Sequence, residues 1–393
     1  MKILVYKWDI FPYDDIIDTM NKQGHDTDVL AFEIKNHIKD DDFNAVLSKY
    51  LENNSYDLVF SVNYFTTISN ICHIFKIRYI SWTCDAPLLS LRNPSVTNPE
   101  NTIYIFDREE YNYFYNKGIK TVHYLPLAGA PERVAKILSK TTFINTKINE
   151  EGSHEKYKYS ISFVGNLYDK NRYDEMENIL PDYFCGYMDA AIEAQLNVSG
   201  GNLLKLMLTD DILNNIEPYI RLEKDDTSTS DIKLHFATSV LSYKTAARMR
   251  TMYLNTLGQI ADIHLFTTSD TSALHGVNIH PPVKYLTEMP LVFASTKINI
   301  NMTIPNIENG APLRIFDIIS AGGFVLTDYR PEICELFIPG KEIAVYDSIE
   351  DMTAKAAYYL KHSDERELIA ENGYKKLCNM HTYTNRIKKI LSV

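Results

Sequence analysis

The sequence predicts an α/β protein of two domains, each built on a parallel β-sheet. Short apolar runs of strand length alternate with longer amphipathic stretches through residues 1–130, and the alternation returns after residue 160. Strands that alternate with helices form βαβ units, which give a parallel sheet covered on both faces. The 393 residues also suffice for two domains that each bury a hydrophobic core.

The first domain is predicted over residues 1–138. Its strand-like runs are Ile3–Lys7, Asp28–Phe32, Leu58–Val62, Tyr79–Thr83, Thr102–Phe106 and Val122–Leu127. The helical patterns between them include Asp14–Lys22, Phe43–Asn53 and Arg108–Asn116. Gly24 follows the first of these helices, where glycine is common because it adopts a left-handed conformation without strain. This order of elements predicts a Rossmann-like domain.

A polar segment at 139–159 has the composition of a linker, and a second Rossmann-like domain is predicted over 160–375. This domain opens with the strand Ser160–Gly165, and a helical pattern over about 173–257 is interpreted as an insertion in it. The later strands are Ile263–Thr267, Lys297–Asn301, Gly323–Asp328 and Ile343–Tyr346. The last segment, 376–393, is predicted as a helix, and its return to the first domain is left open.

Two such domains in tandem are expected to place a central cleft between the carboxyl ends of their sheets, where folds of this class bind ligands. This arrangement suits an enzyme with two substrates, because one domain can hold a nucleotide-bearing donor and the other an acceptor. The formal charge of −11 argues against a protein that binds nucleic acid by general attraction to phosphates.

The cysteine and hydropathy patterns predict a cytoplasmic protein. The five cysteines are scattered and never spaced as Cys-x-x-Cys, which is typical of a reducing compartment. No apolar run approaches roughly 18 residues, so we expect no integral membrane segment. Met1–Lys7 turns charged too early for a signal peptide. His and Cys never have zinc-type spacing, so no metal site is predicted.

The most informative stretch is Asn306–Arg330. A turn at Asn309-Gly310-Ala311-Pro312 leads into a predicted helix at Leu313–Ser320, and a glycine-bearing loop at a helix N-terminus suits a diphosphate. Arg314 could grip phosphate oxygens with two hydrogen bonds. Asp317, three residues later, lies nearly on the same face and could accept both hydroxyls of a ribose. A plain helix with a surface Arg–Asp pair explains the spacing equally well.

Three runs of the sequence resemble the CgeB-like, spore-maturation-type family of glycosyltransferases, which have the two-domain GT-B fold. The most specific run is Arg314-Ile315-Phe316-Asp317 through Thr327-Asp328. The second is Ile161–Tyr168, followed by Arg172, and the third is Trp82-Thr83-Cys84-Asp85-Ala86-Pro87. The resemblance covers nearly the whole chain.

The resemblance implies a hexosyltransferase-like enzyme with a nucleotide-sugar donor, of UDP or GDP type, in the second domain and an acceptor in the first. Gly165 and Asn166 would form the loop near the donor phosphates, Arg172 and Arg314 would contact the phosphates, and Asp317 would bind the ribose. No other cofactor is implied.

This sequence departs from the wider Glu-x7-Glu pattern at the first glutamate. Asn309 occupies that position, with Glu308 beside it, and this puts a retaining mechanism in doubt. Asn166 also occupies a position where the family has arginine, and Lys170 and Arg172 could compensate.

The first domain carries the candidate base. Asp85 follows a strand, beside Trp82 and before Pro87, so we expect it to point into the cleft as a base or an acceptor ligand. An aspartate that caps the following turn is the alternative. Asp9, after the first strand, is a second catalytic candidate. Trp82 could give a sugar a stacking face, although tryptophan is more often part of a core.

Two further groups of residues are candidates. His280 and Tyr285 lie in the connection after the Ile263 strand and are possible contacts to the base or sugar, although chance placement of a histidine is the more frequent explanation. Lys244, Arg248 and Arg250 are interpreted as a solvated basic helix face.

The sequence therefore predicts a metal-independent glycosyltransferase that acts on a protein or glycan acceptor. The alternative is a catalytically silent GT-B protein that binds nucleotide-sugar or supports a partner transferase, and Asn309 favours this alternative. A GT-B epimerase would need acid and base carboxylates around the sugar, which the sequence does not identify.

Overall fold

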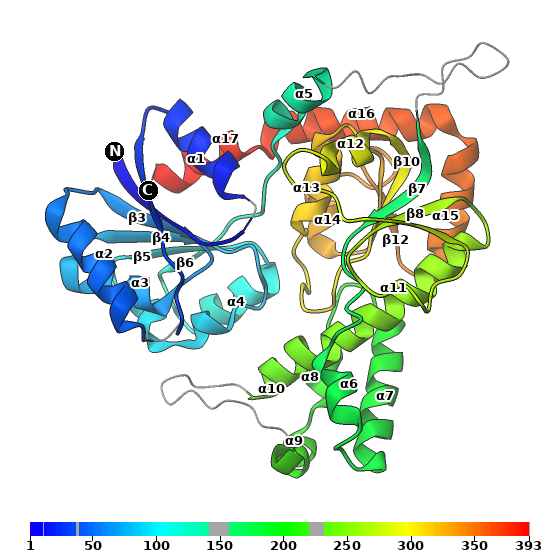
Figure 1. Cartoon of the computed structure of the whole chain (residues 1–393), viewed down its shortest axis with the longest axis horizontal. Coiled ribbons are helices and arrows are strands. Elements are labelled where there is room, and N and C mark those ends of the chain that lie inside the picture. The colour runs from blue at the N-terminus through cyan, green and yellow to red at the C-terminus, as the bar shows by residue number, and fades with distance from the viewer. Residues whose placement is uncertain (11, 37–38, 141–156, 220–231, 393) are drawn as a thin grey trace. The chain divides into compact units, whose positions relative to one another are not determined.

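The computed structural model describes residues 1–10, 12–36, 39–140, 157–219 and 232–392. They form two compact units (Figure 1). The first unit contains Met1–Ala128 and the last helix, α17 (Tyr383–Leu391), and the second contains the described residues between 129 and 382. Each unit has its own hydrophobic core.

A six-stranded parallel sheet forms the centre of the first unit. Its strands are β1 (Lys2–Lys7), β2 (Asp26–Ala31), β3 (Leu58–Val62), β4 (Arg78–Trp82), β5 (Asn101–Ile105) and β6 (Val122–Tyr124). Their order is β2-β1-β3-β4-β5-β6, and all pairs are parallel. Every residue of β3 is buried, as expected for a central strand covered on both faces.

The first unit contains four α-helices and two 3₁₀ helices from the described part of the first 128 residues, followed by α17 at the end of the chain. They are α1 (Tyr13–Lys22), α2 (Asp41–Asn53), α3 (Thr66–Phe75), α4 (Arg108–Asn116) and the 3₁₀ helices η1 (Leu89–Arg92) and η2 (Pro94–Thr97). Asp40 and Asp107 cap α2 and α4 by accepting hydrogen bonds from N–H groups of the first turn. Helix α17 packs against α1, and Arg386 Nε donates to the Pro126 carbonyl at 2.9 Å. The end of the chain therefore completes the first unit.

The second unit also contains a six-stranded parallel sheet. Its strands are β7 (Tyr159–Val164), β8 (Ile263–Phe266), β9 (Val277–His280), β10 (Thr296–Asn301), β11 (Val325–Asp328) and β12 (Ala344–Tyr346). Their order is β12-β11-β10-β7-β8-β9. The helices around this sheet are α5 (Pro131–Lys140), α12 (Met289–Ala294), α13 (Leu313–Ser320), α14 (Pro331–Leu336), α15 (Ile349–Lys361) and α16 (Ser363–Met380).

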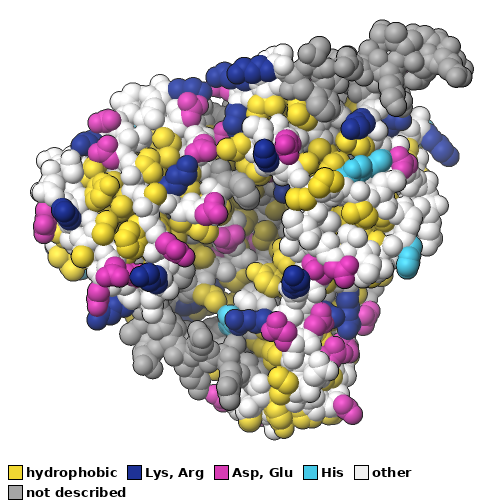
Figure 2. Space-filling model, in the orientation of Figure 1, with side chains coloured by type: hydrophobic (Ala, Val, Ile, Leu, Met, Phe, Trp, Pro, Cys, Tyr) yellow, Lys and Arg dark blue, Asp and Glu magenta, His cyan; other side chains and the backbone are white. Residues whose placement is uncertain are grey.

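Between β7 and β8 the chain forms a helical insertion with a core of its own. Its helices are α6 (Arg172–Glu177), α7 (Asp182–Leu196), α8 (Leu204–Met207), α9 (Asp210–Ile216), η3 (Glu217–Tyr219), α10 (Ile232–His235), the π-helical η4 (Phe236–Leu241) and α11 (Ser242–Gly258). Tyr173, Met188 and Phe236 belong to its buried cluster. Figure 2 shows hydrophobic side chains on the surface of the insertion, where Tyr183 and Leu206 are exposed.

The predicted fold class is confirmed, and α13 has the predicted bounds. Strand β9 was not predicted, because its four residues include the polar Asn278 and His280 and lie at the edge of the sheet. Most of the predicted linker, at residues 141–156, lies outside the described residues. Among the residues that the structure describes, no helix is long and apolar enough to cross a membrane.

Candidate functional site

Polar side chains gather where three neighbouring strands of the second unit end. β7, β10 and β11 lie side by side in the sheet and run in the same direction. Because the carboxyl ends of parallel strands meet at one edge, the loops that follow them lie together there. These loops carry Gly165 and Asn166, then Asn309 and Gly310, and then Arg330.

The loop after β7 is tightly folded around Gly165. A side chain at Gly165 would place its Cβ 3.0 Å from the Phe163 ring, so little space is left for one. Asn166 is exposed, and its Oδ1 accepts hydrogen bonds from Tyr168 N–H and from Ser269 Oγ. Tyr168 has a positive φ of 56°, which is uncommon for a residue other than glycine. The loop is thus held by its own contacts before any ligand binds.

Arg250 on α11 ties this loop to the loop after β10. Its Nη1 donates to the carbonyl of Asn166, and its Nη2 donates to the carbonyl of Met302 at 2.7 Å. The side chain is buried, and burial lowers the pKa of the guanidinium. The interpretation of Arg250 as part of a solvated basic face is therefore wrong. The other two members of that face, Lys244 and Arg248, form ion pairs with acidic residues of the insertion.

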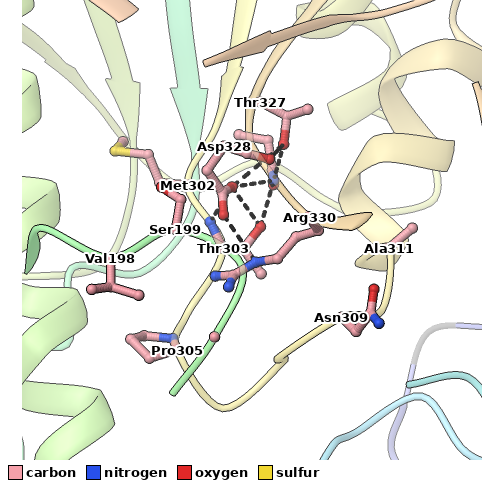
Figure 3. Close-up of polar contacts among 12 residues, drawn as sticks. Val198, Ser199, Met302, Thr303, Pro305, Asn309, Ala311, Thr327, Asp328 and Arg330 are labelled. Carbon is pink, nitrogen blue, oxygen red and sulfur yellow. Dashed lines mark hydrogen bonds and ion pairs between the residues drawn. The ribbon is translucent and has the colours of Figure 1, made fainter. Parts of the chain in front are cut away.

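The ends of β10 and β11 are joined by a buried polar network (Figure 3). Asp328 Oδ1 accepts hydrogen bonds from the backbone N–H of Thr303 at 2.9 Å and from its hydroxyl at 2.6 Å. Asp328 Oδ2 pairs with Arg330 Nε at 3.2 Å. Behind them, Tyr346 donates to the Asn301 carbonyl at 2.9 Å. Asp328 and Arg330 are 6% and 4% exposed, so this ion pair is almost removed from solvent.

The turn before α13 is pinned by a buried glutamate. Glu332 Oε2 accepts a hydrogen bond from Ala311 N–H at 2.8 Å, and Asn309 Oδ1 accepts one from Glu332 N–H at 2.9 Å. Gly310 lies buried between these two contacts. Glu308 pairs with Lys205 of the insertion. Glu332 of α14, the helix that follows β11, thus fixes the geometry of the Asn309–Pro312 turn.

Arg314 and Asp317 lie on one face of α13, as predicted. Arg314 Nη1 is 3.4 Å from Asp317 Oδ2 and also contacts the Met289 sulfur. Tyr285 donates a hydrogen bond of 2.7 Å to Asp317 Oδ1. The structure therefore brings together three of the predicted residues, Tyr285, Arg314 and Asp317. Tyr285 and Asp317 are 32 positions apart in the sequence.

Two other predicted residues have their described contacts elsewhere in the second unit. Arg172 is exposed in the first turn of α6, and its Nη1 is 3.5 Å from His235 Nε2. His280 stacks on Phe266 and its Nε2 is 2.8 Å from His264 Nδ1. Burial and the neighbouring His264 lower the pKa of His280.

In the first unit, Asp85 is held by an asparagine that the sequence reasoning missed. Asn63, which follows β3 and has a positive φ of 62°, donates from Nδ2 to Asp85 Oδ2 at 2.7 Å. Its Oδ1 accepts from the backbone N–H groups of Cys84 at 2.9 Å and Asp85 at 3.3 Å. Burial raises the pKa of Asp85. A polar residue directly after a buried strand was the available signal for Asn63.

The remaining candidates of the first unit, Asp9 and Trp82, differ in their exposure to solvent. Asp9 is exposed after β1. Trp82 is 2% exposed, donates from Nε1 to the Leu125 carbonyl at 3.3 Å and packs against the Tyr383 ring. Trp82 is thus a core residue in this structure. Among the described residues of both units, no cluster of three or more His, Cys, Asp or Glu side chains is arranged to hold a metal ion.

Comparisons with known proteins agree with this architecture. Residues 248–392 match the family described as glycosyl transferase-like. The chain is similar in structure to a UDP-forming α,α-trehalose-phosphate synthase from Burkholderia xenovorans, with a TM-score of 0.55 and 10% identity over 100% of this chain and 98% of that one. It is similar to a glycosyltransferase from Rickettsia africae, with a TM-score of 0.54 and 8% identity over 100% and 97%.

A third similar structure is Anabaena HepE in complex with UDP-glucose, with a TM-score of 0.50 and 10% identity over 100% of this chain and 99% of that one. A search of curated proteins gave no match. At these identities the structural likeness shows the fold. The chain therefore has the GT-B fold, and its residues 248–392 match the glycosyl transferase-like family.

Proposed function

We propose that the protein is a glycosyltransferase of the CgeB-like group that moves a sugar from a UDP- or GDP-sugar to a protein or glycan acceptor. The observation that carries the proposal is the set of contacts at α13, where Arg314, Asp317 and Tyr285 meet after the pinned Asn309–Pro312 turn. The UDP-glucose bound to HepE and the UDP-forming reaction of the synthase are properties of those proteins, and they guide the choice of donor here.

Asp317 is proposed to bind the ribose of the donor. Its carboxylate is already oriented by Tyr285 on one oxygen and by Arg314 on the other. An ionised carboxylate accepts hydrogen bonds only, and its two oxygens have lone pairs left for two neighbouring hydroxyls. The pair of hydroxyls on a ribose matches this acceptor.

The leaving diphosphate needs positive groups and N–H donors as its charge develops. The turn before α13 presents backbone N–H groups at a helix N-terminus, and Arg314 lies in the first turn. Gly165 and Asn166, tied to Met302 by Arg250, are proposed to border the same phosphates. Arg172 and Glu308 remain further candidates. These protein groups supply the required charge, and the proposed reaction needs no metal.

Asp85 is proposed as the base that takes the proton of the acceptor. Its Oδ2 is oriented by Asn63, and its pKa is raised by burial, which brings the carboxylate closer to the basicity that proton transfer at neutral pH requires. Asp9 is the second candidate, and it is exposed.

A catalytically silent protein is the second proposal, and one contact favours it. Asn309 stands where related enzymes have a carboxylate, and its Oδ1 is engaged by the backbone of Glu332. A scaffold would bind nucleotide-sugar without turning it over.

The test combines binding and turnover with purified protein. Calorimetry with UDP, GDP and their hexose derivatives identifies the donor, and release of free sugar without acceptor reports slow hydrolysis. We expect one nucleotide to bind and its sugar to be released. Asp317→Asn should weaken this binding by about tenfold to a hundredfold and slow the release. Asp262→Asn, which changes a surface carboxylate beside His264, should affect neither. Binding without hydrolysis favours the scaffold, and absence of nucleotide binding overturns both proposals.

A further inference from the structure

Arg330 is a buried cation whose contacts are incomplete. It lies directly after β11, at the start of α14, and is 4% exposed. Its Nε forms an ion pair with Asp328 Oδ2 at 3.2 Å, but both Nε and Nη1 are buried without a hydrogen-bond partner in the described part of the chain. An unpaired buried donor costs folding free energy, and a ligand that accepts a hydrogen bond from it would recover part of that cost.

The ion pair with Asp328 fixes the direction of the Arg330 side chain. Asp328 Oδ1 accepts its two shorter hydrogen bonds from Thr303 and two of 3.4 Å from Asn301 and Thr327. The carboxylate cannot turn away from the guanidinium without losing these contacts. Asp328 therefore anchors Nε and leaves the outer nitrogens for another partner. Figure 3 shows the guanidinium extending from Asp328 toward Pro305 and the segment that carries Val198 and Ser199.

That segment of the insertion is docked onto the loops of the sheet. Ser199 Oγ donates to the Asp347 carbonyl at 2.9 Å, and Asn202 Nδ2 donates to the Pro305 carbonyl at 3.3 Å. A side chain at Gly200 would place its Cβ 3.2 Å from the Tyr329 ring, so glycine permits the close approach. The surroundings of Arg330 are thus built by three separate parts of the second unit.

A second buried guanidinium lies near the first. Arg250 and Arg330 both act electrostatically on Tyr346, and Asp328 acts on Arg250 as well. The carboxylate of Asp328 thus forms an ion pair with Arg330 and lies within electrostatic reach of Arg250. The nearby buried carboxylate of Glu332 accepts a hydrogen bond from the Ala311 N–H group through Oε2.

We propose that Arg330 binds a phosphate group of the substrate through the edge of its guanidinium that Asp328 leaves open. A guanidinium presents N–H donors in a planar fork that matches phosphate oxygens, and a carboxylate on Nε holds that fork in place. The proposal deepens the proposed function, on which it rests, by assigning a charged phosphate contact after β11 in addition to those of α13. The phosphate belongs either to the donor diphosphate or to a phosphorylated acceptor.

The experiment is calorimetry of UDP, UMP, uridine and inorganic pyrophosphate with the wild-type protein, Arg330→Gln, Arg330→Lys and Arg366→Gln. Arg366 is a matched control, because it is 3% exposed in the same unit and donates from Nη1 to the Tyr359 carbonyl of α15. If the nucleotide that binds proves to be GDP, the guanine series replaces the uracil series. Melting temperatures establish that each variant is folded, and the milder Arg330→Lys serves if Arg330→Gln does not fold.

We expect Arg330→Gln to weaken diphosphate and pyrophosphate binding by about tenfold to a hundredfold, the usual range for one charge-assisted hydrogen bond. Uridine should bind as before, and Arg366→Gln should lose stability without losing affinity. A loss of affinity for UDP assigns the donor phosphate. A loss for pyrophosphate while UDP binds as before places the phosphate outside the nucleotide, as expected for a phosphorylated acceptor.

Equal affinity of wild-type protein and Arg330→Gln for every phosphate compound would overturn the inference and leave the proposed function standing. Binding of pyrophosphate that depends on Arg330, without binding of any nucleotide, would support the inference and overturn the proposed donor.

Discussion

Tyr285 donates a hydrogen bond of 2.7 Å to Asp317 Oδ1, and these residues come from a loop and a helix 32 positions apart. Arg314 approaches the other oxygen of the same carboxylate. The carboxylate is therefore oriented before a ligand arrives, which lowers the entropy that ligand binding would otherwise cost.

Asp317→Asn is expected to weaken nucleotide binding by about tenfold to a hundredfold, because it removes the charge from the two hydrogen bonds proposed to the ribose. Tyr285→Phe should weaken binding by only about fivefold, since it removes a single positioning bond of about 1 kcal/mol. Titration calorimetry checks the ranking, and a larger effect from Tyr285→Phe than from Asp317→Asn would contradict it.

Much of the fold could be predicted from sequence. The bounds of α13 follow from the Pro312 turn and from Gly322, which has a positive φ of 68° directly after the helix. The β9 strand was missed because nothing local separates its four residues from a loop.

The arrangement of the candidate site residues could be predicted from the sequence only where they are close together in it. Arg314 and Asp317 are three positions apart, so helical geometry alone places them on one face. Arg250 lies on a helix with Lys244 and Arg248, and the spacing of the three gives no sign that only Arg250 is buried. Its partners, the carbonyls of Asn166 and Met302, are more than fifty positions away and are backbone groups.

Arg250→Met is expected to destabilise the second unit by about 3 kcal/mol, because the carbonyls of Asn166 and Met302 each lose a charge-assisted hydrogen bond. Urea unfolding measures the loss. Arg248→Met, which removes ion pairs on the same helix with partly exposed partners, should cost less than about 1 kcal/mol and serves as the control. Equal losses would show that the Arg250 contacts carry little energy.

Asp85→Asn is expected to lower sugar transfer by about a hundredfold to ten-thousandfold, in the range of general base catalysis. Donor binding should stay unchanged, because Asp85 belongs to the first unit and the donor is assigned to the second. Initial rates with an identified acceptor, together with calorimetry of the donor, separate the two effects. Full turnover by the variant would exclude Asp85 as the base.

The raised pKa of Asp85 also predicts a pH dependence of stability. A carboxyl group whose pKa is higher in the folded than in the unfolded protein stabilises the fold below its ordinary value of 3.8. That contribution is lost as the pH rises through the folded pKa. Relative to Asp85→Asn, the wild-type protein should therefore lose stability from pH 4 to pH 7 in urea unfolding, whereas a constant difference would contradict the raised pKa.

Gly373 on α16 allows two backbones to touch. An added Cβ would lie 2.3 Å from the Glu342 carbonyl oxygen, so Gly373→Ala is expected to destabilise the protein by about 2 kcal/mol or more. Gly186, inside α7, has no atom within 4 Å of an added Cβ, and Gly186→Ala should instead stabilise by about 0.5–1 kcal/mol. If both variants shifted the melting temperature in the same direction, the packing of Gly373 against the Glu342 backbone would not be tight enough to exclude a Cβ atom.

The central claim is that the second unit holds an activated sugar by its nucleotide at the start of α13. A crystal structure of the protein with its preferred nucleoside diphosphate tests it most directly. The account predicts ribose hydroxyls within hydrogen-bond distance of the Asp317 carboxylate and phosphate oxygens beside the Asn309–Arg314 segment. A nucleotide bound with no contact to Asp317 or to that segment would contradict it.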